Sequence, residues 1–259
     1  MIRLSCILIA LALIGIYAEE PEKLVGGTRT AIQENAHAVS IQMNGQHFCS
    51  GSIINNDAIL TAAHCVTELV AIPHMLSSVT VVSGSTYNNM IDNNGQRHRV
   101  KQAYYYPGYQ QSSGRTPGGD IGILKLSQPM VFNERQKPVK LPFKNIIPGV
   151  PLKVVTWGAQ GFRQRVHNDL RKIEGNSMEA SECQRYHRYM KIDKLEFCIL
   201  IRAKVGTCNG DSGGGVISRI DGTIVGLVSG GMPCAHGIPD VYTTVHPYSS
   251  WIRSIVSGI

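Results

Sequence analysis

Several features that would mark common classes of binding protein are missing from this sequence of 259 residues. It contains no Cys-x-x-Cys or His-x-x-x-His spacing, which argues against a zinc site. Around residues 83–97, Asp92 is the only acidic residue, so neither a calcium loop nor a required metal or cofactor is expected. The net charge of +7 is not gathered into a basic stripe with interleaved aromatic residues, so nucleic-acid binding is not expected.

Beyond the first 18 residues, the sequence also lacks an apolar run long enough to span a membrane. At the amino terminus, Arg3 precedes the apolar run Leu4–Tyr17, and the small residue Ala18 precedes two glutamates. This pattern is typical of a secretory signal peptide, residues 1–18, rather than of a membrane span. We therefore expect a secreted, extracellular protein with no membrane partner.

The cysteines fit an oxidising compartment. Cys6 leaves with the signal peptide, and six cysteines remain. An even number predicts three disulfides, for which fifteen pairings exist. Proximity in the sequence favours the pairs Cys49–Cys65, Cys183–Cys198 and Cys208–Cys234.

The remaining sequence has the pattern of an all-β protein. It is low in aromatic residues and rich in glycine, and short β-prone segments alternate with turn residues. The segments predicted as strands are Ala38–Met43, Phe48–Ile54, Ala58–Thr61, Ser78–Val82, His98–Tyr104, Ile121–Leu126, Leu152–Thr156, Leu170–Ile173, Glu196–Ile199, Gly214–Ser218, Thr223–Val228 and Val241–Val245. Helices are predicted over Met178–Tyr189 and Tyr248–Val256, and Arg135 to Pro138 is the best candidate for a linker between two halves.

Three polar residues lie in contexts that suit nucleophilic chemistry. Ser212 stands in Gly210-Asp211-Ser212-Gly213-Gly214, where glycines allow a sharp turn and a close approach of backbone N–H groups to a ligand. A serine hydroxyl also needs a base and donors that receive the developing charge. His64 follows a β-prone segment and precedes a cysteine, and Asp120 precedes another such segment. Taken singly, Ser212 is equally well explained as part of a surface turn, whereas His64 and Asp120 are better explained as a strand-end and a turn residue.

Together with two further motifs, these residues resemble the chymotrypsin-like (trypsin-fold) serine proteases, in which the triad order is His, Asp, Ser. The matching motifs are Leu24-Val25-Gly26-Gly27, Thr61-Ala62-Ala63-His64-Cys65, Asp120-Ile121-Gly122-Ile123-Leu124, Gly210-Asp211-Ser212-Gly213-Gly214 and Pro239-Asp240-Val241-Tyr242. Three predicted disulfides, a short propeptide and the segment 237–242 make the chain most similar to arthropod chymotrypsins. The resemblance implies two six-stranded antiparallel Greek-key β-barrels with a C-terminal helix. The peptidase domain would cover 24–259, divided into barrels of about 24–137 and 138–259.

The same resemblance implies a role for each matching residue. Ser212 would be the nucleophile, His64 the general base and acid, and Asp120 the residue that orients His64. The backbone N–H groups of Gly210 and Ser212 would form the oxyanion hole. Ser229 would support Asp120. The substrates would be polypeptides, and protein protease inhibitors are further possible partners of what is expected to be a monomer.

The resemblance also implies that the protein is made as a zymogen. Residues 19–23 would be an activation propeptide, and a trypsin-like protease would cut after Lys23. The new amino terminus at Leu24 would then pair with the buried Asp211. Members of the family prefer Ile or Val at this first position, so the fit of Leu24 in its pocket is an open point.

Residues of the specificity pocket carry a mixed signal. Gly206 stands where trypsin-like members have an aspartate, and Gly231 leaves room for a large side chain, which together favour cleavage after aromatic or large aliphatic residues. Thr207 and Ser229 would also line the pocket. Asp240 would lie on its far wall, where it either admits Lys and Arg or only accepts hydrogen bonds from the backbone and water. If the apolar preference holds, Gly206→Asp should raise activity on Arg.

Three glycines depart from the family pattern: Gly230 replaces an aromatic residue, Gly215 a proline and Gly122 an alanine. Two alternative functions therefore remain open at this stage. One is a catalytically weak protease homologue that serves as a binding or regulatory protein. The other is a broad-specificity protease that degrades collagen.

Overall fold

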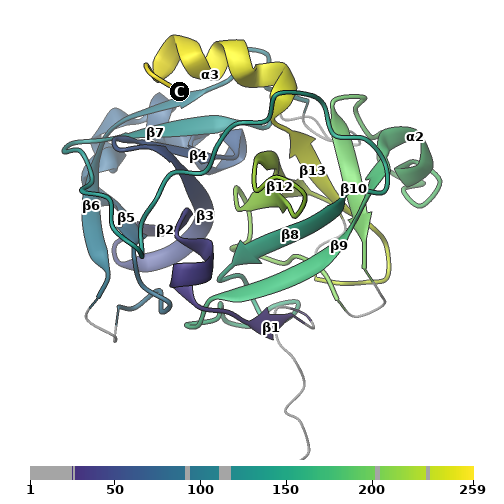
Figure 1. Cartoon of the computed structure of the whole chain (residues 1–259), viewed down its shortest axis with the longest axis horizontal. Coiled ribbons are helices and arrows are strands. Elements are labelled where there is room, and N and C mark those ends of the chain that lie inside the picture. Colours follow the sequence, from purple (N-terminus) through teal and green to yellow (C-terminus); the bar gives the residue numbers. More distant parts are fainter. Residues whose placement is uncertain (1–24, 26, 91–93, 111–117, 202–204, 232–233) are drawn as a thin grey trace, which may run out of the picture.

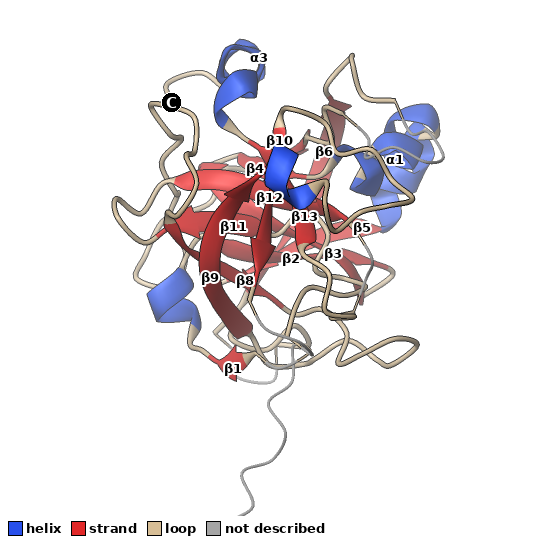
Figure 2. Ribbon diagram, turned by 90° about the vertical axis from the view of Figure 1, so that its right-hand side faces the viewer, coloured by secondary structure: helices blue, strands red, loops and turns tan. Residues whose placement is uncertain are grey.

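The computed structural model describes residues 25, 27–90, 94–110, 118–201, 205–231 and 234–259 (Figure 1). The signal peptide, the propeptide and Leu24 lie outside these residues. Within the described parts of the chain, no helix has the length and apolarity needed to cross a bilayer. Strands fill the centre of the molecule and short helices lie at its periphery (Figure 2).

Six strands of the first half pair in a closed antiparallel barrel. In the order of pairing they are β2 (Ala38–Met43), β3 (Gln46–Asn55), β4 (Ala58–Thr61), β7 (Gly122–Leu126), β6 (Gln96–Tyr105) and β5 (Val79–Ser83). Alternate side chains of these strands fill the interior, where Ile41, Ile59 and Leu124 are fully buried. This burial explains why β-branched and aliphatic residues recur at short intervals in the sequence.

Six strands of the second half form the other barrel. They are β8 (Pro151–Thr156), β9 (Arg171–Glu179), β10 (Glu196–Leu200), β13 (Asp240–Thr244), β12 (Ile224–Gly230) and β11 (Gly215–Ser218). The ring closes because β8 pairs with both β9 and β11. Leu152, Phe197 and Tyr242 are among the residues of its core. The predicted all-β fold with two six-stranded antiparallel barrels is thus confirmed.

The two ends of the chain pack outside their own halves. A short strand, β1 (Thr28–Arg29), pairs with β9 of the second barrel, and Ile32 in the following 3-10 turn η1 (Ile32–Asn35) packs against Trp157 (Figure 1). At the other end, helix α3 (Ser249–Ile255) packs Ile252 into the cluster that holds Leu60 and Ile123 of the first barrel. Each barrel is therefore fastened to the other by a terminal segment.

The helices differ in part from the sequence-based expectation. The C-terminal prediction is confirmed by a 3-10 turn, η4 (His246–Tyr248), that runs into α3. The prediction of a helix over Met178–Tyr189 is wrong in its extent, because β9 continues to Glu179 and α2 covers only Ala180–Cys183. Met178 pairs with Cys198 of β10, and this long-range pairing overrides the local preference for a helix.

The remaining short helices flank the first barrel. They are the 3-10 turn η2 (Ala63–Cys65), helix α1 (Thr67–Ala71) and the 3-10 turn η3 (Pro73–Ser78). Three disulfides join Cys49 to Cys65, Cys183 to Cys198 and Cys208 to Cys234. These are the pairs favoured by proximity in the sequence. The first fixes η2 to β3, and the third ties the segment before Ser212 to the segment before β13.

Candidate active site

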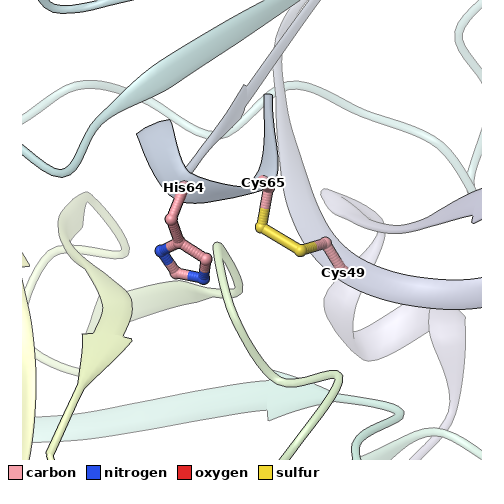
Figure 3. Close-up of side chains that lie close together, drawn as sticks. All are labelled: Cys49, His64 and Cys65. Carbon is pink, nitrogen blue, oxygen red and sulfur yellow. A yellow bond between two sulfur atoms is a disulfide. The ribbon is translucent and has the colours of Figure 1, made fainter. Parts of the chain in front are cut away.

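His64 is held by the end of strand β4 and by the first disulfide. The chain leaves β4 at Thr61 and turns through η2, where Cys65 is bonded to Cys49 beside the imidazole (Figure 3). Atoms of Cys49, His64 and Cys65 lie within 4.8 Å of one another. The two sulfur atoms are bonded to each other and offer no thiolate, so this cluster does not suit a metal ion.

Asp120 orients the imidazole of His64. It lies fully buried just before β7. Its Oδ1 accepts a hydrogen bond from the backbone N–H of His64 at 2.9 Å, and its Oδ2 accepts one from His64 Nδ1 at 2.8 Å. Ser229 Oγ, at the end of β12, donates to the same Oδ2 at 2.6 Å. With a proton held on Nδ1, the Nε2 atom of His64 is the free base.

The surroundings of His64 act on its pKa in opposite directions. Burial lowers the pKa, but the hydrogen bond and the negative charge of Asp120 together outweigh burial, so the net effect raises the pKa above its ordinary value. Asp120 therefore stabilises the imidazolium that forms when His64 takes up a proton.

Ser212 lies in a tight turn that only glycines permit on either side. Gly210 and Gly213 have positive φ angles of 90° and 77°. A Cβ atom on Gly213 would lie 2.0 Å from Thr61 Oγ1 and 2.6 Å from the Ser50 carbonyl oxygen. The turn is thus pressed against the end of β4, three residues before His64.

The second barrel holds the other side of this turn. The N–H of Gly213 donates to the Val228 carbonyl at 2.8 Å, one residue before Ser229, which contacts Asp120. The structure thus brings His64, Asp120 and the Ser212 turn to one junction between the barrels. Among the described residues, no hydrogen bond joins Ser212 Oγ to His64 Nε2. Catalytic hydrogen bonds are often loose in the absence of substrate.

The backbone around Ser212 leaves two donors available. The N–H groups of Asp211, Gly213 and Gly214 are each bonded to a carbonyl oxygen. In the part of the chain that the structure describes, the N–H groups of Gly210 and Ser212 have no such partner. These two are the groups that the sequence predicted as an oxyanion hole.

Side chains of strands β2 and β3 form a hydrogen-bonded support for the Ser212 turn, which the sequence did not reveal. His47 Nε2 donates to the Gly210 carbonyl at 2.9 Å, and Ser50 Oγ donates to the same oxygen at 3.1 Å. Ser40 Oγ in turn bonds His47 Nδ1 at 2.8 Å. Burial lowers the pKa of His47 to about 4, although the bond to Gly210 acts in the other direction, so the ring is neutral and keeps its Nε2 proton.

Asp211 lies fully buried beneath the turn. Its Oδ1 accepts the N–H of Gly158 at 2.8 Å and its Oδ2 accepts the N–H of Cys208 at 2.6 Å. Burial raises the pKa of Asp211 to about 6, against the effect of its hydrogen bonds with Thr156, Cys208 and Gly158.

Val25, at the start of the N-terminal segment, lies beside the disulfide that precedes Asp211 in the chain. Val25 packs against the disulfide Cys208–Cys234, and its carbonyl accepts the N–H of Gly206 at 3.1 Å. The predicted activation residues Lys23 and Leu24 lie outside the described residues.

The predicted pocket residues converge beside this segment. Asp240 begins β13 and is 4% exposed, and its Oδ2 accepts the N–H of Thr207 at 2.6 Å. A Cβ atom on Gly206 would lie 2.7 Å from the same Oδ2. Gly231, with a φ of 122°, faces Asp240 and Val241 from the end of β12. The carboxyl group of Asp240 thus lies in close contact with the position where a side chain at residue 206 would begin.

This geometry bears on one expectation from the sequence. An aspartate at position 206 would bring a second carboxyl group against Asp240 Oδ2, so the side chain of Asp240 would have to move. The gain of activity on Arg in Gly206→Asp stays a prediction. Burial raises the pKa of Asp240 to about 7, and the charge of Asp211 adds to this effect, while bonds from Thr207 oppose it.

The three departing glycines are explained in different ways. A Cβ atom on Gly122 would lie 2.7 Å from Val66 Cγ2, and one on Gly215 would lie 2.4 Å from Ser52 Oγ. Both positions therefore require glycine for close packing. Gly230 is exposed with open space around it, so no packing demand accounts for the missing aromatic ring.

Comparisons with known proteins are consistent with this site. A sequence model of the trypsin family matches residues 24–252. Trypsin delta of Drosophila erecta is 31% identical over 242 residues, which are 92% of this chain and 90% of that protein. Trypsin alpha of Drosophila melanogaster is 30% identical over 249 residues, which are 95% of this chain and 92% of that protein. These relatives are named trypsins, whereas the motifs resembled arthropod chymotrypsins most.

Proposed function

Because this chain belongs to the trypsin family of serine endopeptidases, we propose that Ser212, His64 and Asp120 are its catalytic triad. Ser212 Oγ attacks the carbonyl carbon of the scissile bond while His64 Nε2 takes the hydroxyl proton. His64 returns this proton to the leaving amine, and the acyl group remains on Ser212. Water then attacks the acyl-enzyme with His64 again as base, which releases the acid product and regenerates the serine.

The hydrogen bonds of Asp120 are the observation that carries this proposal. Three donors converge on one buried carboxylate, two from His64 and one from Ser229. They fix the orientation and tautomer that a general base requires. The N–H groups of Gly210 and Ser212 would stabilise the oxyanion, and one such donor typically contributes about 2.7–4 kcal/mol in the transition state.

Activation is proposed to follow cleavage after Lys23. The position of Val25 against the Cys208–Cys234 disulfide supports this, because the residue before it would enter close to Asp211. A new ammonium group there would compensate a buried carboxylate and lower its pKa. With the signal-peptide pattern and the three disulfides, the proposal is of a secreted, extracellular zymogen.

For the residue before the cut, we propose a preference for large apolar side chains. Gly206 provides no carboxylate of its own, and Gly231 brings no side chain into the space beside Asp240 and Val241. The names of the relatives favour basic residues instead, and Asp240 is the group through which this chain could accept them.

A fluorophosphonate probe tests the proposed chemistry directly. The protein cut after Lys23 should be labelled at Ser212, and the uncut protein should be labelled much more slowly. Ser212→Ala should abolish labelling, while Ser254→Ala, on the exposed face of α3, serves as a matched serine control. Absence of labelling at Ser212 in the cut protein would favour a binding or regulatory role.

A peptide library varied at the residue before the cut then tests the specificity. Cleavage after Arg tenfold better than after Phe at every pH would rule out the apolar preference. Native collagen belongs in the same assay, because the combination of Gly206 and Asp240 keeps a collagen-degrading activity as a second candidate.

A further inference from the structure

The hydrogen-bonded support of the Ser212 turn continues outward across the first barrel. In β2, the residues on either side of Ile41, a core residue, face away from the core. These two residues, Ser40 and Gln42, are polar and almost fully buried. Strand β5 lies beside β2 and β6 lies beside β5, which brings the exposed Arg97 of β6 into one row with Ser40 (Figure 1). The buried polar side chains of β2 thus lie between the Ser212 turn and a surface arginine.

Four hydrogen bonds run in sequence from Arg97 to the carbonyl oxygen of Gly210. Arg97 Nη1 donates to Gln42 Oε1 at 2.7 Å, and Gln42 Nε2 donates to Ser40 Oγ at 3.2 Å. Ser40 Oγ lies 2.8 Å from His47 Nδ1, and His47 Nε2 lies 2.9 Å from the Gly210 carbonyl oxygen. The chain of bonds therefore starts at a cation on the surface and ends at the turn that carries the proposed nucleophile.

The two ends of this chain of bonds determine where each proton lies. A guanidinium group has only donors, so the side-chain oxygen of Gln42 must face Arg97. The Nε2 atom of Gln42 then donates to Ser40 Oγ and, at 2.6 Å, to the carbonyl oxygen of Asn88. Because Ser40 receives a hydrogen from Gln42, its own hydroxyl hydrogen is directed to His47 Nδ1. His47 must then carry its proton on Nε2, the atom that faces a carbonyl oxygen.

The orientation of the Gly210 carbonyl is important because the same residue carries a proposed oxyanion donor. Gly210 has a φ of 90°, and a glycine can rotate away from this conformation unless the peptide groups on both sides are held. The peptide group before Gly210 is held by the second barrel, where the N–H of Ala159 donates to the Asn209 carbonyl at 2.7 Å. The peptide group after Gly210 is held by the first barrel, through His47. The direction of the Gly210 N–H therefore depends on both barrels.

We propose that Gln42 and Arg97 are positioning residues for the reaction, which act on the oxyanion hole through His47. This inference rests on the proposed function. The charge of Arg97 polarises each bond that follows, so every donor in the chain of bonds holds its acceptor more firmly. Loss of Arg97 should leave His47 in place but weaken its hold on Gly210, and the oxyanion donor should then be less well oriented when the oxyanion forms.

Kinetics of the full protein cut after Lys23 and titrated with fluorophosphonate test the role of Arg97. Arg97→Met keeps an apolar stem and removes the donors, and it should lower kcat about threefold to fivefold with KM unchanged, since one hydrogen bond is lost. Arg97→Lys keeps a cationic donor and should recover part of the rate. Arg99→Met is the matched control and should leave kcat unchanged. Arg99 is exposed on the same strand, and within the described residues its side chain forms no hydrogen bond or ion pair.

The same measurements separate this inference from the proposed function. An unchanged kcat in Arg97→Met, in an enzyme whose Ser212 is labelled normally, would overturn this inference and leave the proposed function intact. Failure of the parent protein to be labelled at Ser212 would count against the proposed function itself.

A double-mutant cycle shows whether Arg97 acts through His47. In the His47→Ala background the chain of bonds is already interrupted, so the further change Arg97→Met should have no effect on kcat. An equal loss in both backgrounds would assign Arg97 to another route and overturn the inference. Gln42→Met interrupts the chain at its centre and should lower kcat at least as much as Arg97→Met, with no further loss when the two changes are combined. A normal kcat in Gln42→Met would contradict the proposal as well.

Nitrogen NMR of isotope-labelled histidine provides evidence that does not depend on changes at Arg97 or Gln42. The measurement uses the Ser212→Ala form cut after Lys23, which cannot digest itself, and the signals lost in His47→Ala assign the ring. The spectrum should show a neutral His47 ring with its proton on Nε2. A proton on Nδ1 would reverse the direction of the chain of bonds and overturn the inference.

Discussion

Asp120 and Asp240 are both buried carboxyl groups, but their surroundings differ. Asp120 receives two hydrogen bonds from His64 and one from Ser229. Among the described residues, the hydrogen bonds to Asp240 come from Thr207, and the charge of another buried acid, Asp211, acts on it. The protein supplies the first carboxylate with a partner that can become a cation. Within the described residues it gives the second carboxyl group no such partner, at the place where we propose that the substrate side chain enters.

The largest effect on catalysis is expected from a change at Asp120. In Asp120→Asn, the amide would offer a donor to His64 Nδ1, which would favour the tautomer with the proton on Nε2 and remove the base. We expect kcat to fall by about 10⁴-fold, the loss that this change causes in the triad template of the family. Active-site-normalised kinetics at pH 8 measure it, with Asp221→Asn as control. A loss below tenfold would contradict the role of Asp120.

The second prediction concerns the stability of the protein and a change at Asp240. The pKa of Asp240 is raised to about 7 in the folded protein, so the folded state holds a proton that the unfolded state releases near pH 4. Stability should therefore decrease as the pH increases from about 4 to about 7. Asp240→Asn removes this loss and should stabilise the protein by about 2–4 kcal/mol at pH 8, with no gain at pH 4.

Calorimetry of both forms checks this, with Ser212→Ala as the background to prevent self-digestion. Each kcal/mol should appear as roughly 2–4 °C in Tm. If Asp240→Asn stabilised the protein less at pH 8 than at pH 4, the result would show that burial does not disfavour the ionised form of the Asp240 carboxyl group.

A smaller effect is expected from Gly206→Asp. The new Cβ atom would lie 2.7 Å from Asp240 Oδ2 and 3.4 Å from Ala235 Cα. Overpacking of this kind costs about 1–3 kcal/mol. The double variant Gly206→Asp with Asp240→Gly should recover this stability and cleave after Arg. Thermal unfolding measures the stability of each variant, and kinetics on an Arg peptide measure the cleavage. If Gly206→Asp alone were as stable as the parent, the result would show that the side chains around position 206 move aside at little cost.

The smallest effect is expected behind the Ser212 turn. His47→Ala removes a donor from the Gly210 carbonyl and should lower kcat about tenfold, because the loss of one such hydrogen bond costs about 1–2 kcal/mol. His47→Gln offers an N–H in a similar place and should recover part of the rate. An increase of KM alone, with kcat unchanged, would instead place His47 in substrate binding.

Local sequence patterns were sufficient for much of the fold. β2 and β4 coincide with the predicted segments Ala38–Met43 and Ala58–Thr61, since both are short, β-prone and almost wholly buried segments that end at turn residues. The helix predicted over Met178–Tyr189 failed because pairing of β9 with β8 and β10 depends on residues far away in the chain.

The site could be predicted only in part for a similar reason. The residues predicted for the triad stand in recognisable motifs. His47 is 163 positions away from the Gly210 carbonyl that it contacts, and no local pattern links the two. The distance between Asp240 and position 206 is likewise a product of folding, which is why the effect of Gly206→Asp could not be judged from residue types.

The exchange of terminal segments between the barrels also bears on how the molecule forms. The first barrel needs Ile252 of α3 to complete its packing, although α3 follows the last strand of the second barrel in the chain. The second barrel needs Ile32, which precedes the first strand of the first barrel. Neither half of the chain completes its barrel without a segment of the other half, so the junction that carries His64 and Ser212 should form only as both barrels fold together.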